Sequence, residues 1–145
     1  MPAAARKLSV EFDSGVQLVG SQLDAQRLSA TEHWLHPPSN YLHLRLYWSS
    51  TRALLAEPVV QVMLEDEPGN QWGSLLERPG AVRAFHPLAR QPAGALLRDE
   101  LDLIVNPAAK PGVYKVVLRV TNADGSAMLA NGQSYIILDE VLIVP

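Results

Sequence analysis

One short stretch of the chain carries a row of side chains suited to binding. Within YLHLRLYW, every second residue is aromatic or polar: Tyr41, His43, Arg45 and Tyr47. In an extended strand these four side chains project from one face. Aromatic rings and guanidinium groups on a sheet can stack on sugar rings or contact a protein surface. They are therefore the candidate binding residues, with cross-strand pairing or coverage by residues 21–40 as the competing explanation.

Acidic residues gather in a second stretch, ALLRDELDLIV. Alternation places Glu100 and Asp102 on one outward face, which a solvated strand surface would also explain. Carboxylate pairs that catalyse hydrolysis are defined by distance, not by sequence spacing. A hydrolase whose carboxylates converge from loops, in a cleft lined by Trp34, Trp72 or His86, therefore stays an alternative.

No cofactor, no metal and no catalytic residues are expected. His33 and His36 are spaced i, i+3 in a Pro-flanked segment and lack a third ligand at a recognisable spacing. The acidic turns DEPGN and NADGS do not match the calcium loop of an EF-hand, and are better explained as hairpin turns. No G-x-S-x-G, H-E-x-x-H, phosphate-binding glycine loop or dinucleotide fingerprint is present. The pattern predicts a protein that is not an enzyme.

The elements that must position these residues are strands. Two-residue alternation of apolar side chains recurs in KLSVEF, VQLVGSQL, YLHLRLYW, PVVQVMLED, QWGSLL, ALLRDELDLIV, VYKVVLRV and residues 134–144. Asp99 interrupts the apolar face of its run, which predicts a bulge or a strand end there. Only SQLDAQRLSATEHWL has any helical spacing. Seven to nine strands with Pro and Gly at their edges predict an all-β fold, an antiparallel two-sheet sandwich.

Composition narrows the classes of partner. Twelve Lys and Arg against fifteen Asp and Glu give a net charge of -3 without charged runs, which argues against nucleic acid. The longest apolar stretch, YIILDEVLIVP, is interrupted by two acids and falls short of the roughly 20 residues of a membrane span. The amino terminus has no apolar signal-peptide core. We expect residues 1–11 to form a flexible N-terminus and first strand, and residues 12–145 to form a single β-sandwich domain.

The order of these segments resembles a known family. FDSGVQLVGSQLD, YLHLRLYW, VVQVMLEDEPGNQW, LLRDELDLIV, PGVYKVVLRV and LDEVLIV together resemble the immunoglobulin-like β-sandwich domain of bacterial extracytoplasmic and membrane-anchored proteins. That family includes the carboxyl-terminal region of some glycosyltransferase-like membrane proteins. The resemblance implies an immunoglobulin-like fold and an extracytoplasmic location. It also implies that Tyr114 forms a tyrosine corner, in which the hydroxyl bonds to an upstream backbone group.

These observations favour a non-catalytic accessory module of a larger extracytoplasmic protein. The module would bind a carbohydrate or protein partner, or act as a spacer, without inserting into a membrane. A structural subunit is a further alternative, in which edge strands such as the apolar final strand pair between copies to form a homo-oligomer.

Overall fold

The computed structural model describes the chain except for residues 25–26, 30–40 and 77–81. The described part holds nine strands: β1 (Arg6–Glu11), β2 (Val16–Leu23), β3 (Arg27–Ser29), β4 (Tyr41–Ser50), β5 (Val59–Glu65), β6 (Gln71–Leu75), β7 (Leu97–Val105), β8 (Gly112–Thr121) and β9 (Ile136–Val144). Between β6 and β7 lie a short helix, α1 (Val82–Phe85), and a 3-10 helix (Leu88–Arg90). The prediction of an all-β fold with seven to nine strands is confirmed.

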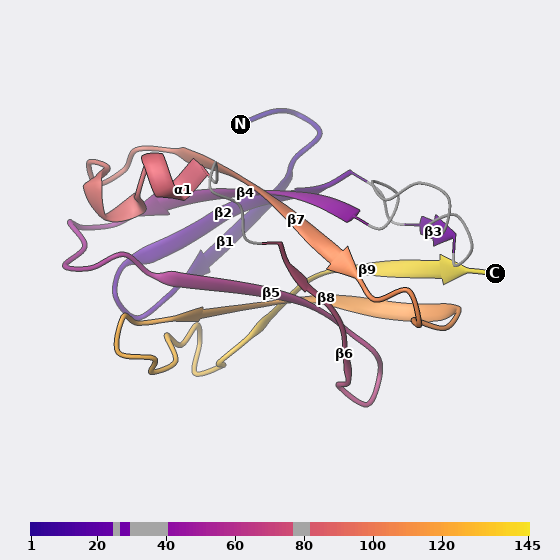
Figure 1. Ribbon diagram of the computed structural model, residues 1–145. Helices are drawn as coiled ribbons and strands as arrows, with labels where there is room; N and C mark the ends of the chain where they lie inside the picture. The colour runs from indigo at the N-terminus through magenta and orange to yellow at the C-terminus, as the bar shows by residue number, and fades with distance from the viewer. Residues whose placement is uncertain (25–26, 30–40, 77–81) are drawn as a thin grey trace.

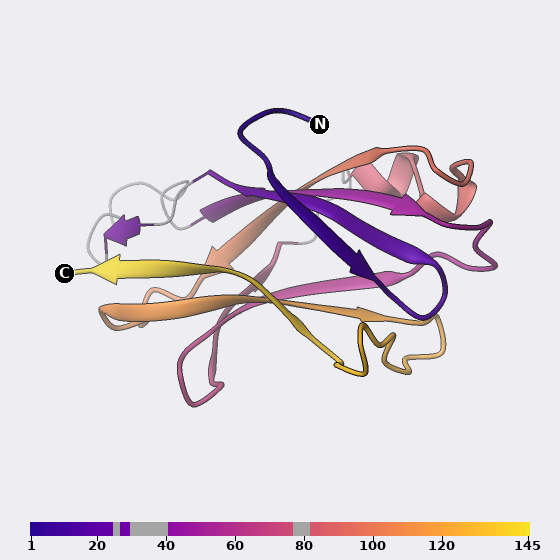
Figure 2. The same cartoon turned by 180° about the vertical axis from the view of Figure 1, so that it is seen from behind.

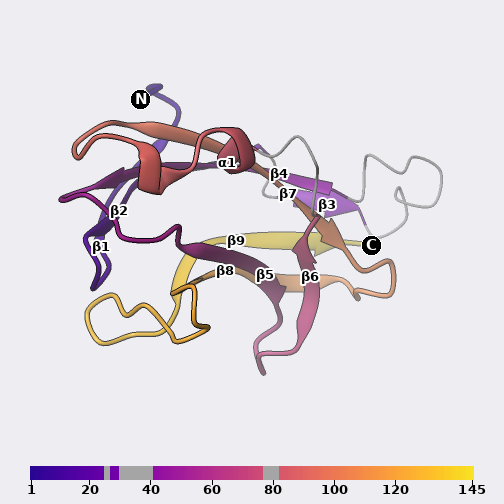
Figure 3. The same ribbon diagram turned by 60° about the vertical axis from the view of Figure 1, so that its left-hand side comes forward.

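The strands form one mixed sheet that curls into a half-barrel (Figure 1). The order of the strands in the sheet is β1-β2-β4-β7-β6-β5-β8-β9-β3, with β1 and β3 at its two edges. Purely antiparallel pairing is wrong at one place, because β3 pairs in parallel with β9. β6 pairs with both β5 and β7, and it joins the upper and lower parts of the half-barrel in Figure 3. The view from behind shows β1 and β2 above β8 and β9 (Figure 2).

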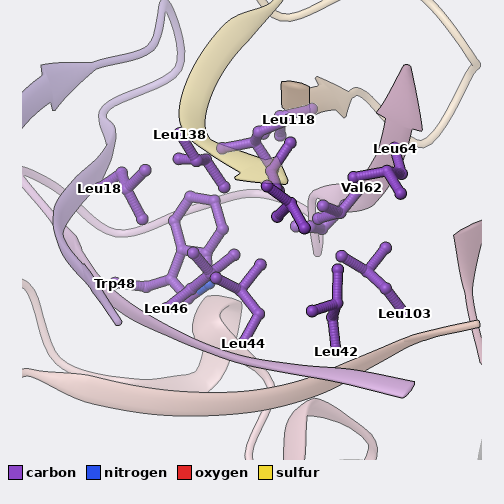
Figure 4. Packing of buried hydrophobic residues seen from close by; sticks show 14 of the residues in the cluster. Leu18, Leu42, Leu44, Leu46, Trp48, Val62, Leu64, Leu103, Leu118 and Leu138 are labelled. Carbon is purple, nitrogen blue, oxygen red and sulfur yellow. The ribbon is translucent and has the colours of Figure 1, made fainter. Parts of the chain in front are cut away.

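The apolar faces of the strands meet inside the half-barrel. β4 supplies Leu42, Leu44, Leu46 and Trp48, all at most 1% exposed. Figure 4 shows this row facing apolar side chains of β5, β8 and β9, among them Val62, Leu64, Leu118 and Leu138, while Leu103 of β7 lies beside Leu42. Burying each aliphatic side chain of this kind stabilises the fold by about 1.5–3 kcal/mol. The alternation seen in the sequence therefore identifies the core correctly on β4, β5 and β8.

Tyr114 holds the entry of β8, as the resemblance implied. Its ring is buried, and its hydroxyl donates a hydrogen bond of 2.6 Å to the backbone carbonyl of Lys110. Because the bond spans four residues, it fixes the approach of the chain to the strand. The arrangement is that of a tyrosine corner. Tyr114 therefore has a structural role.

The acidic turn between β5 and β6 is a hairpin turn, as predicted. The Asp66 carboxylate accepts hydrogen bonds from the backbone N–H of Asn70 at 2.7 Å and from the Trp72 indole N–H at 2.9 Å. Gly69 has φ near +95°, which favours glycine. Hydrogen bonding, led by that from Trp72, lowers the pKa of Asp66. The carboxylate therefore serves the turn.

Asp99 does not mark a bulge or a strand end, so that prediction is wrong. β4 and β7 pair in unbroken register, with Leu46 opposite Asp99 and Leu44 opposite Leu101. Asp99 therefore projects into the interior with the apolar residues around it, and is 1% exposed. The strand continues because the rest of its inward face is apolar, and because α1 supplies a cation that reaches the carboxylate.

Candidate functional site

The predicted binding row lies on the outer face of β4, opposite acidic residues of β7. The antiparallel register places His43 opposite Asp102 and Arg45 opposite Glu100. His43 Nδ1 lies 2.7 Å from the Asp102 carboxylate, and His43 Nε2 lies 3.5 Å from Glu100. The candidate binding residues of β4 and the acidic residues of β7 thus form one cluster. Glu100 and Asp102 pair with His43 and Arg45 instead of forming a separate carboxylate pair.

Arg45 ties this cluster to the loop after β2. Its Nε donates to Glu100 at 3.0 Å, and its terminal NH1 donates to Asp24 at 2.9 Å. The hydrogen bond from Arg45 lowers the pKa of Glu100, and the same bond raises the pKa of Arg45. The guanidinium is therefore engaged with the protein's own carboxylates, which is typical of cross-strand stabilisation.

The two tyrosines of the row differ in exposure. Tyr41 is 37% exposed, whereas Tyr47 is 2% exposed and its hydroxyl has no hydrogen-bond partner in the described structure. Tyr47 pairs with Gly20 of β2, which has no side chain, and the Met1 side chain packs over Gly20. The amino-terminal segment thus covers this part of the outer face. Tyr47 is therefore closed to a partner, whereas binding through Tyr41, His43 and Arg45 stays a prediction.

A second site lies at a gap in the sheet between β5 and β7. β6 pairs with β5 only at Met63, Leu64 and Glu65 of β5, and with β7 only at Leu103, Ile104 and Val105 of β7. Beyond these ladders the strands diverge around a pocket of about 870 Å³, here called the slot. Its lining comes from β5 (residues 59–63), β6 (Gln71, Ser74, Leu75), the following Leu76, α1 (Arg83, Ala84) and β7 (Asp99, Leu101).

Asp99 is the buried charge of the slot. Its Oδ2 lies 3.4 Å from Arg83 Nε, yet neither carboxylate oxygen has a hydrogen bond of acceptable geometry. Burial raises the pKa of Asp99, while Arg83 and the indole N–H of Trp48 act in the opposite direction. The Trp48 N–H also lacks a well-formed hydrogen bond. The slot therefore contains a buried acceptor, Asp99, that the described residues leave without a well-formed hydrogen bond.

Arg83 reaches Asp99 from a position fixed by the loop before β5. Its NH1 donates to the Pro58 carbonyl at 3.3 Å and lies 3.9 Å from Glu57. The Glu57 carboxylate accepts the backbone N–H groups of Leu88 and Ala89 at 3.1 and 2.8 Å. The connection between β6 and β7, which shows no period in the sequence, is anchored by these polar contacts.

Of the three residues proposed to line a hydrolase cleft, the structure describes only Trp72 and His86. Trp34, like His33 and His36, lies outside the described residues. Trp72 bonds to the β5–β6 turn, and exposed His86 follows α1. Neither of these two residues lines the slot. Within the described ranges, no group of three His, Asp or Glu side chains is arranged to hold a metal.

The slot is not predicted by the sequence, although the sequence contains one residue that indicates it, Asp99. Asp99 is a charged residue on an otherwise apolar strand face, and such a residue is normally paired or functional when buried. Arg83 gave no signal, because its segment has no periodicity.

Comparison of the chain with protein-family models, curated proteins and solved structures gives no match. No helix among the described residues is long and apolar enough to cross a membrane.

Proposed function

We propose that the chain is a non-catalytic β-sandwich accessory module that binds an extended segment of a partner protein in the slot. The observation that carries this proposal is an open strand edge beside a pocket. No described residue pairs with residues 59–62 of β5 on the side away from β8. These residues line the slot.

An open strand edge offers backbone N–H and C=O groups to an added strand. Four residues of β5 extend over about 13 Å, which matches a short peptide segment. Leu75 and Leu101, which are only partly buried, supply apolar area for the side chains of such a segment. Backbone hydrogen bonds would give affinity, and the slot would give specificity.

The strand order supports the immunoglobulin-like part of the proposal. β9, β8, β5 and β6 follow one another as strands G, F, C and C′ do in that fold, and β4 lies beside β7 as B lies beside E. The Tyr114 corner stands on the strand that corresponds to F. An extracytoplasmic location follows from this resemblance and is part of the proposal.

The geometry favours a protein over a carbohydrate partner. A sugar platform would need several open rings, and Tyr47 is buried. Edge pairing between copies through β9 is also less favoured, since the Arg6 guanidinium donates to the Leu138 carbonyl at 2.9 Å. That contact occupies an acceptor of the final strand with a charged side chain, a device that opposes edge pairing. A spacer without a ligand would leave the slot unexplained.

Selection from a displayed library of random peptides tests the proposal. Amide chemical-shift mapping of the selected peptides should perturb residues 59–62, Leu75 and Leu101. A Val60→Pro variant, which places a proline in the strand next to the slot, should weaken binding, whereas a Lys115→Ala control on β8 should not. A glycan array run in parallel distinguishes the carbohydrate alternative. Glycan binding at Tyr41 with no peptide binding at the slot would overturn the proposal.

A further inference from the structure

We infer that the segment bound in the slot carries a lysine or arginine whose cation pairs with Asp99, an inference that rests on the proposed function. Two carboxylates, Asp99 and Glu57, share one guanidinium, that of Arg83. The described charges of this group therefore sum to minus one when all three side chains are ionised.

The two carboxylates are not equally satisfied. Glu57 accepts two backbone N–H groups, so its charge is stabilised where it stands. Asp99 is 1% exposed and accepts no well-formed hydrogen bond, and its contact with Arg83 is a loose 3.4 Å. A buried carboxylate without hydrogen bonds carries a desolvation cost that a charged donor reduces. Asp99 is therefore the group in the slot that gains most from an added cation.

The position of Asp99 suits a side chain delivered by an added strand. Asp99 lies on β7, on the inner face of the sheet, and β5 forms the other wall of the slot. A segment paired with the β5 edge would lie between these walls, with alternate side chains directed inward. Lysine and arginine can pass their aliphatic stems over Leu101, which is only partly buried. Because Asp99 is 1% exposed, the charged group meets the carboxylate by displacing the Arg83 side chain.

The guanidinium of Arg83 on α1 already lies beside the Asp99 carboxylate, which indicates that the slot accommodates a cationic group. Its Nε lies 3.4 Å from Oδ2. An acidic segment would be repelled by Asp99, and a neutral one would leave the carboxylate unsatisfied. A metal ion is a poorer candidate, since no third carboxylate or histidine joins the group among the described residues.

Matched peptides test the inference. The tightest library peptide is synthesised with its lysine or arginine and with norleucine in that position, and both are titrated into wild type and Asp99→Asn. We expect norleucine to weaken binding to wild type by about tenfold or more, and to have little effect on Asp99→Asn. Glu100→Gln, which removes a carboxylate from the outer face, is the control and should behave as wild type. Arg83→Gln removes the internal competitor and should strengthen binding of the cationic peptide.

The outcomes separate the inference from the proposed function. Peptides that bind the slot equally well with norleucine would overturn the inference and leave the function standing. If no peptide binds the slot, the proposed function fails, and n-butylammonium serves as the probe of Asp99. Chemical-shift changes at Leu101 and Val62 in wild type, absent in Asp99→Asn, would then support the cation site. Identical shifts in both proteins would overturn it.

Discussion

Arg83 and Asp99 form an ion pair in the lining of the slot, with 3.4 Å between Nε and Oδ2. The pair joins α1 to β7 where β6 no longer lies between β5 and β7. Its acid is almost completely buried and its cation is shared with Glu57. Breaking such a pair usually costs more than the pair contributes, because a buried charge is left behind. The effect of substitution therefore depends on which charge is removed.

Asp99→Asn should raise the free energy of unfolding near neutral pH. Burial raises the pKa of Asp99, so the folded protein keeps this proton to a higher pH than the unfolded chain does. Stability then falls as pH rises from the ordinary aspartate pKa of about 3.9 through the folded pKa. Asparagine resembles the protonated acid at every pH and removes this loss. Urea unfolding should show a gain near neutral pH that disappears in acid, whereas a loss near neutral pH would show that Arg83 outweighs burial.

Asp66→Asn should have the opposite effect. The hydrogen bond from Trp72 is the main cause that lowers the pKa of Asp66. A lowered folded pKa contributes stability above the unfolded pKa, and that stability is lost as pH falls through the folded value. The variant should be less stable than wild type near neutral pH and should approach it in acid. Equal stability at neutral pH would remove the role assigned to this turn.

Tyr114→Phe should cost about 0.5–1.5 kcal/mol of stability. The change removes only the hydroxyl that donates to the Lys110 carbonyl, and the ring stays buried. Tyr135→Phe is the matched control, because Tyr135 is 44% exposed and its ring contacts Arg119. Thermal unfolding of both variants measures the difference. A Tyr114 variant as stable as the control would contradict the tyrosine corner.

Gly73→Ala should destabilise the junction of β6 with its two neighbours by about 1–3 kcal/mol. A Cβ there would lie 2.9 Å from the Ile104 carbonyl oxygen and 3.0 Å from Leu64 Cβ. The carbonyl belongs to the paired strand β7 and cannot move without loss of the ladder. Ser74→Ala, at an exposed position of the same strand, is the control. Hydrogen exchange at β6 should rise in the first variant only, and unchanged exchange would show that the strands adapt.

Substitution of the outer row should leave peptide binding intact. Arg45→Met removes bonds to Glu100 and Asp24 and should lower stability slightly, since both contacts are partly exposed. Tyr41→Ala removes the open aromatic ring. Neither variant should change the Kd of a slot peptide by more than about twofold. A large loss of affinity in either would place the binding surface on the outer face of β4.

Local alternation was enough to predict most strands and much of the core. Val60, Val62 and Leu64 point inward as their spacing indicates, and Tyr114 anchors its strand. Two-residue alternation identifies the apolar face of a strand, because successive residues of a strand point to opposite faces. It also flagged Asp99 as an anomaly, although it assigned the wrong consequence.

The amino-acid sequence by itself determined the class of fold, the faces of the strands and the turn residues. Tertiary structure decided which strands meet: it paired β3 with β9, set His43 against Asp102, buried Tyr47 beside Gly20 and brought Arg83 to Asp99. These relationships join residues distant in the chain, and their register depends on packing of the whole sheet. The residues next to a position in the sequence do not identify its long-range partners, so the slot could be found only from the folded chain.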